Sequence, residues 1–148
     1  MLVRVTSHRE PEPLALDAFE RLALHVLRME DAPDEVELSI AIVGTEEMSR
    51  LNQQYRGIDG PTDVLSFGCD DPCLATEGEP IVLGDVIIAP EVAERQAAEL
   101  GVTVEAELNL LLVHGILHLF GYDHDDEEDA RVMQERERVV LDAYAPEA

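Results

Sequence analysis

The stretch VHGILHLFGYDH, Val113 to His124, places three histidines in an otherwise apolar segment. His114 and His118 are four residues apart, so on a helix their imidazoles lie on one face and can bind the same ion. Gly121 can adopt a positive φ and reverse the chain, which would bring His124 back as a third ligand. Three imidazoles and one open position are typical of catalytic zinc, whereas structural zinc usually has four protein ligands. The stretch therefore predicts a helix that carries a zinc site.

The spacing of these histidines is that of the metzincin zinc proteases, H-E-x-x-H-x-x-G-x-x-H, with one exception. Gly115 stands where the catalytic glutamate belongs. Amide hydrolysis in that manner needs a glutamate to pass a proton to the leaving amine, and glycine cannot do this. Phosphodiester cleavage has other needs, because zinc itself lowers the pKa of a bound water to about 7 and a cationic side chain can stabilise the phosphate. The missing glutamate weakens a protease interpretation and agrees with a nuclease.

Other interpretations of this region concern the acidic residues after the helix. Asp123 is predicted to orient an imidazole from behind, as carboxylates next to metal ligands often do. Asp125 and Asp126 fit equally well a solvated, acidic start of the last helix, which the helix dipole favours. The acidic run could also suit a harder ion than zinc. A purely structural role for the histidines, two in the core and one on the surface, is disfavoured by their spacing.

The elements on either side of the histidine helix follow from hydrophobic periodicity and turn residues. We expect strands at 2–6, 36–43, 63–67 and 83–89, and helices at 14–29, 46–55, 91–100, 104–120 and 127–144. The helix that ends at residue 120 is apolar on nearly every side from 108 onward, which predicts burial. The order predicts an α+β fold, zincin-like, in which a small mixed sheet packs against helices and residues 1–148 form one domain.

The charge of the chain is strongly negative. There are 33 acidic and 10 basic residues, a formal net charge of −23, and every basic residue is arginine. Such a field repels nucleic acid at long range and attracts basic proteins, so any RNA contact has to be local and made by arginine. The simplest explanation is a salt-adapted or merely soluble acidic surface.

Cysteine usage and hydropathy suggest the compartment. Cys69 and Cys73 lie in C-x3-C spacing without further recognisable ligands, which predicts two free thiols and a reducing environment. The first residues lack an apolar signal segment, and the most apolar stretch is too short to span a membrane. We therefore expect a cytoplasmic protein with no membrane partner.

Three segments together resemble the YbeY family of bacterial ribosomal RNA maturation factors, also called UPF0054 metalloproteins. They are VHGILHLFGYDH, LNQQYRGIDGPTDVLSF (51–67) and LGDVIIAPEVA (83–93), and they occur in order across much of the chain. The resemblance implies a zinc-dependent, single-strand-specific endoribonuclease that acts in 3′-end maturation of 16S ribosomal RNA and in ribosome quality control. It further implies that His114, His118 and His124 bind one Zn²⁺ per chain, with His114 and Arg56 catalytic and Arg56 also contacting the substrate.

The partners implied by the resemblance are single-stranded RNA, the small ribosomal subunit and a basic ribosomal protein, and no DNA is expected. Two alternatives stay open: a zinc-stabilised assembly factor without catalysis, and, less favoured, a metalloprotease. Taken alone, Arg56 could also cap helix carbonyls or pair with Asp59 or Asp63. The family often has proline where this chain has Gly68, and the resemblance does not extend to the loop from Gly68 to Pro80.

Overall fold

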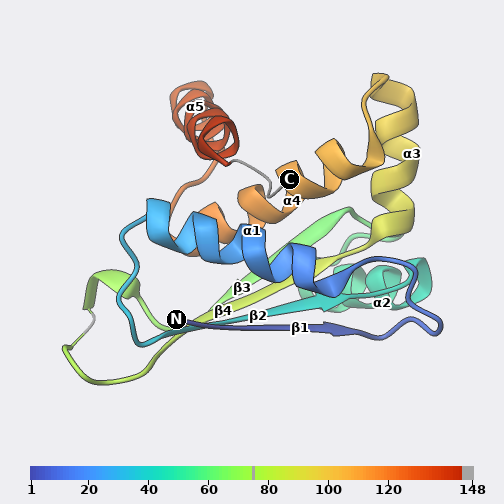
Figure 1. Cartoon of the computed structure of the whole chain (residues 1–148). Coiled ribbons are helices and arrows are strands. Elements are labelled where there is room, and N and C mark those ends of the chain that lie inside the picture. The colour runs from blue at the N-terminus through green and yellow to red at the C-terminus, as the bar shows by residue number, and fades with distance from the viewer. Residues whose placement is uncertain (75, 145–148) are drawn as a thin grey trace.

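The computed structural model describes residues 1–74 and 76–144. A twisted sheet lies beneath a layer of helices, with the histidine helix in the middle of that layer (Figure 1). The elements are β1 (Leu2–Ser7), α1 (Leu16–Met29), β2 (Val36–Ile42), α2 (Thr45–Arg56), β3 (Val64–Gly68), the short 3₁₀ helix η1 (Pro72–Leu74), β4 (Ile81–Ile88), α3 (Pro90–Leu100), α4 (Val104–Leu119) and α5 (Glu127–Ala143). The predicted α+β class, with its mixed sheet, is confirmed.

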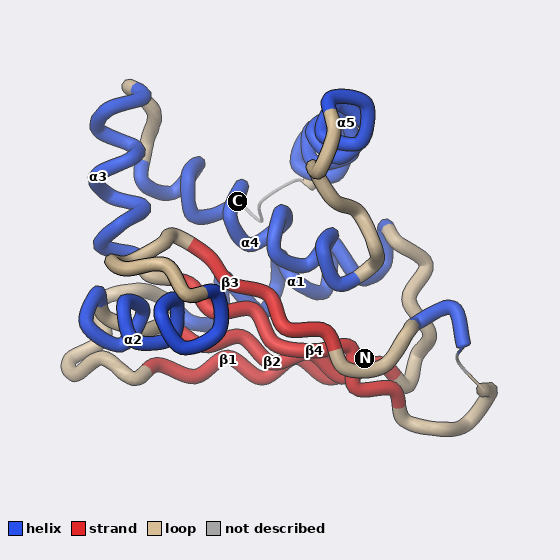
Figure 2. Tube along the Cα trace, turned by 180° about the vertical axis from the view of Figure 1, so that it is seen from behind, coloured by secondary structure: helices blue, strands red, loops and turns tan. Residues whose placement is uncertain are grey.

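The sheet has the strand order β1-β2-β4-β3. β1 and β4 both run parallel to β2, whereas β3 pairs antiparallel with β4 and forms one edge. Burial alternates strictly along β2, as a half-buried strand requires. The same alternation sends Ser66 of β3 toward α4, while Leu65 joins a separate cluster with Met48 of α2. Helices therefore lie against both faces of β3 (Figure 2).

The core is organised around α4. This helix contacts β3, β4, α1, α3 and α5, so it has neighbours on almost every side. Leu112, Val113, Ile116 and Leu117 are completely buried. The prediction of a buried central helix is confirmed, and its cause is the run of apolar residues around the whole helix circumference.

Element ends differ slightly from the sequence prediction. β4 begins at Ile81, two residues early, because Ile81 pairs with Val36 of β2 in a parallel register that no local pattern reveals. The segment expected as loop contains the single turn η1. In the described part of the chain no single helix has the length and apolar character to cross a membrane; α3 and α4 pass that test together, but they are bent by 118°.

Candidate metal centre

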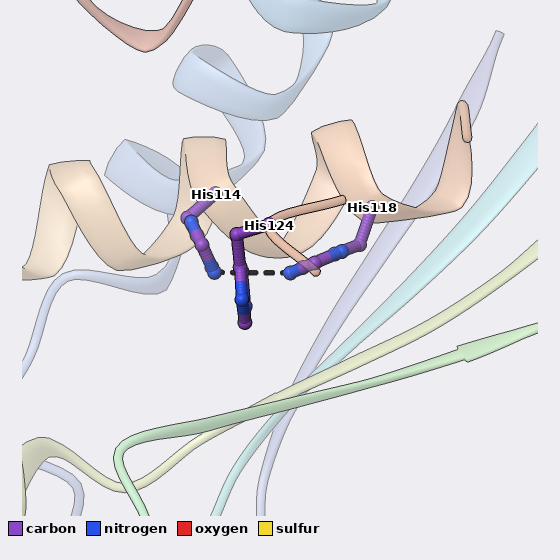
Figure 3. Close-up of side chains that lie close together, drawn as sticks. All are labelled: His114, His118 and His124. Atoms are coloured by element: carbon purple, nitrogen blue, oxygen red, sulfur yellow. Dashed lines mark hydrogen bonds between the residues drawn. The ribbon is translucent and has the colours of Figure 1, made fainter. Parts of the chain in front are cut away.

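The three histidines meet beside the end of α4. Their ligand atoms all lie within 4.8 Å of one another. The Nε2 atoms of His114 and His118 are 3.0 Å apart, and the ring of His124 lies 5.6 and 5.1 Å from theirs, centroid to centroid. Figure 3 shows the three imidazoles converging from the helix and from the turn that follows it. The predicted gathering of the histidines is confirmed.

Gly121 allows the chain to turn back after α4, which brings His124 next to the other two histidines. Its φ of 97° is a left-handed conformation that side chains disfavour. The Gly121 N–H donates to the His118 carbonyl at 3.1 Å, which ends α4 and reverses the chain. The carbonyl of Tyr122 then accepts a hydrogen bond from Nδ1 of His118 at 2.9 Å. The turn thus delivers His124 and also fixes the ring orientation of His118.

The donor set fits a divalent transition metal. With its Nδ1–H bonded to the Tyr122 carbonyl, His118 presents the lone pair of Nε2. Two nitrogens bound to tetrahedral zinc at 2.0–2.1 Å lie roughly 3.3 Å apart, close to the separation of the Nε2 atoms of His114 and His118. Burial, followed by the neighbouring His114, lowers the pKa of His118. The neutral imidazole that metal binding requires is therefore favoured.

Glu137 of α5 is a further residue of the centre, which the sequence reasoning missed. Its Oε1 accepts a hydrogen bond from Nδ1 of His114 at 3.4 Å, and the residue is only 6% exposed. A sequence signal existed, because Glu137 shares the inward face of the last helix with Met133 and Val140. A carboxylate at such a core position needs a partner, and the partner is a histidine of the cluster.

Asp123, the residue predicted to support an imidazole, has a different contact. Its Oδ1 accepts a hydrogen bond from the backbone of Asp125 at 3.4 Å. Within residues 1–74 and 76–144 no hydrogen bond joins Asp123 to the three rings, although its charge slightly opposes the lowering of the His118 pKa. A role for Asp123 in orienting an imidazole stays a prediction.

The turn that carries His124 is braced by a partly buried ion pair that connects α5 to the residue after α1. Arg136 of α5 donates through Nε to Glu30, which follows α1, at 2.6 Å, and through Nη2 to the Met29 carbonyl at 2.7 Å. The Tyr122 hydroxyl donates to the same Glu30 carboxylate at 3.2 Å. The Glu30 side chain is only 8% exposed. The position of the ligand-bearing turn therefore depends on α1 and α5 together.

The histidines border a hollow of about 480 Å³ that also contains Arg56. Other lining residues include Thr62, Asp63 and Ser66. Arg56 is the last residue of α2, is exposed, and donates through Nη1 to Asn52 at 3.5 Å. In the described part of the chain it forms no ion pair, with Asp59, Asp63 or any other acid. Its guanidinium is therefore available to an anion in the hollow.

Gly115 is required by close packing of α4 on the sheet. A Cβ at this position would lie 2.7 Å from Cγ1 of Val86 and 3.2 Å from Oγ of Ser66. The Ser66 hydroxyl also donates to the Gly115 carbonyl at 2.8 Å. The position that holds the catalytic glutamate in metzincins therefore has no room for any side chain here.

The remaining residues considered from sequence lie outside the hollow. His8 pairs with Glu47 at 2.7 Å, and His25 bonds to the Val140 carbonyl at 2.8 Å. Cys69 and Cys73 are exposed and form no disulfide with each other.

The fold and the site together define a class: an α+β protein with a three-histidine centre that could hold a metal ion. The family described as Endoribonuclease YbeY matches residues 5–145 of the chain. The Endoribonuclease YbeY of Pelotomaculum thermopropionicum is 46% identical over 122 residues, which cover 82% of this chain and 80% of that protein. The Endoribonuclease YbeY of Geobacillus thermodenitrificans is 40% identical over 137 residues, which cover 87% of this chain and 86% of that protein. The chain belongs to the YbeY endoribonuclease family.

A solved structure shares the fold. The solution structure of TM1509 from Thermotoga maritima superimposes with a TM-score of 0.66 at 28% sequence identity, and the match covers 95% of this chain and 87% of that one.

Proposed function

We propose that this chain is a zinc-dependent endoribonuclease that cuts single-stranded RNA at the three-histidine centre. One observation carries the proposal: three converging imidazoles and an arginine without an acidic partner border the same hollow. Membership of the YbeY family supports RNA as the substrate. His114, His118 and His124 would hold one zinc ion, with Glu137 behind His114.

The chemistry divides between the metal and the chain. When bound, the ion supplies Lewis-acid activation for attack on the phosphodiester. Arg56 lines the same hollow as the histidines, and its N–H groups would donate to phosphate oxygens and stabilise the charge that grows there. Gly115 leaves no glutamate next to the first histidine, so peptide hydrolysis in the metzincin manner lacks its proton carrier.

We place this activity in the cytoplasm, in 3′-end maturation of 16S ribosomal RNA and in ribosome quality control, with residues 1–148 acting as one domain. The support is the family, together with a net charge of −23, which suits a basic ribosomal protein as partner. Asp123 is retained in this proposal as a residue that helps to orient an imidazole.

The test uses purified protein on single-stranded RNA and on casein, with and without chelator and with zinc added back. His118→Ala should abolish both zinc binding and RNA cleavage. His8→Ala is the matched control, because His8 lies outside the centre and is exposed. We expect RNA cleavage by the wild type and by His8→Ala only, about one zinc per chain in both, and intact casein throughout.

Three results would contradict the proposal. RNA cleavage that persists in His118→Ala would identify a contaminating nuclease. Zinc-loaded protein that binds a basic ribosomal protein and cuts no RNA would favour the non-catalytic assembly factor. Casein hydrolysis that needs zinc would favour the protease.

A further inference from the structure

A second hollow, of about 630 Å³, adjoins the metal centre. It lies between α4, α5 and the start of β3, and it shares His114, Asp63 and Val64 with the hollow of the three histidines. A ligand that reaches the metal centre can therefore continue into this second hollow, which we name the α4–α5 hollow.

Glu107 is the unusual residue of the α4–α5 hollow. It lies in the first turn of α4, lines the hollow and is only 6% exposed. In the described residues its carboxylate has no hydrogen-bond or ion-pair partner, whereas the nearby Glu137 is bonded to His114. Burial, together with the charge of Asp63, raises the pKa of Glu107. No buried side-chain oxygen in the described residues lacks a hydrogen-bond partner, so the Glu107 oxygens reach the hollow, where a ligand that brings N–H groups can donate to them.

The walls of the hollow restrict what that ligand is. Leu110, Leu111 and Leu141 supply apolar surface, and Gln134, Arg138 and Asp142 line the same hollow. The hollow therefore suits a ligand that combines an apolar body with polar groups at its edge. Glu107 and His114 lie on the same face of α4, seven residues apart, which corresponds to roughly 10 Å along the helix. That distance is about the reach from a phosphate to the hydrogen-bonding edge of a base in the same or the next nucleotide.

We propose that the α4–α5 hollow receives the base of a nucleotide adjacent to the cleaved phosphate and selects guanine through Glu107; this rests on the proposed nuclease function. Guanine offers N1–H and an N2 amino group side by side, which match the two oxygens of a carboxylate. Adenine and cytosine offer one amino group next to an acceptor nitrogen. Uracil offers one N–H between two carbonyl oxygens, which a carboxylate repels. Reading an unstacked base on this edge is the usual mode for single-stranded RNA.

The experiment compares labelled oligouridylates that carry one guanine, inosine or adenine at a fixed position. Inosine differs from guanosine only in that its base lacks the N2 amino group. We expect the wild type to cut beside guanine about 10-fold faster than beside inosine, the scale of one lost contact in a bidentate pair. In Glu107→Gln the ratio should fall close to one. Glu105→Gln is the matched control, because Glu105 is exposed on the same turn, and it should keep the wild-type ratio.

Zinc content and melting temperature, measured for each variant, separate a loss of selectivity from misfolding. Equal cleavage beside guanine, inosine and uracil by the wild type would overturn the guanine site and leave the nuclease proposal intact. If no oligonucleotide is cut, the nuclease proposal fails. Fluorescence anisotropy then tests the guanine site by binding alone, with the same oligonucleotides and with protein treated with chelator. Equal affinity for all the oligonucleotides, or binding of a basic peptide alone, would overturn the guanine site.

Discussion

Arg56 is one of ten arginines in a chain with 33 acidic residues, and it lines the histidine hollow. We expect Arg56→Glu to lower RNA turnover by roughly 10²-fold or more, the scale of one lost transition-state donor. Zinc content and melting temperature should stay near wild type, because in the described residues the guanidinium makes only one long hydrogen bond, to Asn52. Arg56→Lys should recover part of the loss, since a point charge replaces a bidentate fork.

Arg50→Glu is the matched control for Arg56, with the same charge change on an exposed position of the same helix. Steady-state cleavage of a fluorogenic RNA measures all three variants. If Arg56→Glu and Arg50→Glu lower turnover equally, the effect is one of general charge, and Arg56 loses its assigned role.

Glu137 is expected to position His114 for the metal. Glu137→Leu should weaken zinc binding by about 10–100-fold, the usual effect of removing a carboxylate behind a ligand histidine. The apoprotein should lose up to about 1–3 kcal/mol of free energy of unfolding, because leucine leaves Nδ1–H of His114 without its acceptor. Glu137→Gln should lose less zinc affinity, since the amide oxygen still accepts from Nδ1.

Chelator competition gives the zinc affinity of these variants, and chemical denaturation gives their stability. Glu135→Gln, on the exposed side of the same helix, is the control. Zinc affinity unchanged in Glu137→Leu would show that the contact with His114 is incidental.

At the level of single residues, the sequence was enough to predict the three histidine ligands, but not the side chain that supports them from another helix. The three histidines are close in the chain and follow a helix-and-turn spacing, so local geometry alone brings them together. Glu137 reaches His114 from a different helix, and no local pattern links the two. Glu107 is buried by the packing of α4 in the tertiary structure, which no local pattern reveals.

Among the elements, the packing of α4 on the sheet is close enough at Gly115 to be tested by one added carbon atom. Gly115→Ala should lower the free energy of unfolding by about 1–3 kcal/mol, the range for overpacking a core. This loss is expected even though alanine favours a helix by roughly 1 kcal/mol over glycine. The cause is the 2.7 Å approach of the added Cβ to Val86.

Val86→Ala removes the atom that the new Cβ would meet. In that background Gly115→Ala should cost less, with a coupling of about 1 kcal/mol or more in a double-mutant cycle measured by urea unfolding. Additive losses would show that Val86 does not set the limit at this position.

The order of helices and strands could be predicted from hydrophobic periodicity. Each helix or strand exposes one face or none, and the spacing of its apolar residues reflects this. The strand order β1-β2-β4-β3 did not follow, since it depends on pairing between segments up to dozens of residues apart. The early start of β4 has the same origin in its pairing with β2.

For the whole molecule, the net charge of −23 sets how RNA approaches. Salt screens the long-range repulsion between the acidic chain and RNA. In a plot of the logarithm of affinity against the logarithm of salt concentration, each phosphate contacted by arginine contributes a slope of about −0.7. With Arg56 as the main contact, we expect a slope between 0 and about −1 in anisotropy titrations from low to moderate salt. A slope of about −3 or steeper would reveal a basic tract that the charge distribution does not suggest.

The brace of Arg136, Glu30 and Tyr122 has a consequence for the newly made chain. During translation α1 and the whole sheet leave the ribosome first, then α4 with its two histidines, and α5 last. Until residues 136 and 137 emerge, the ligand-bearing turn is untethered and His114 lacks its carboxylate. Metal capture would therefore coincide with completion of α5, so that a half-made chain beside ribosomal RNA holds no finished centre.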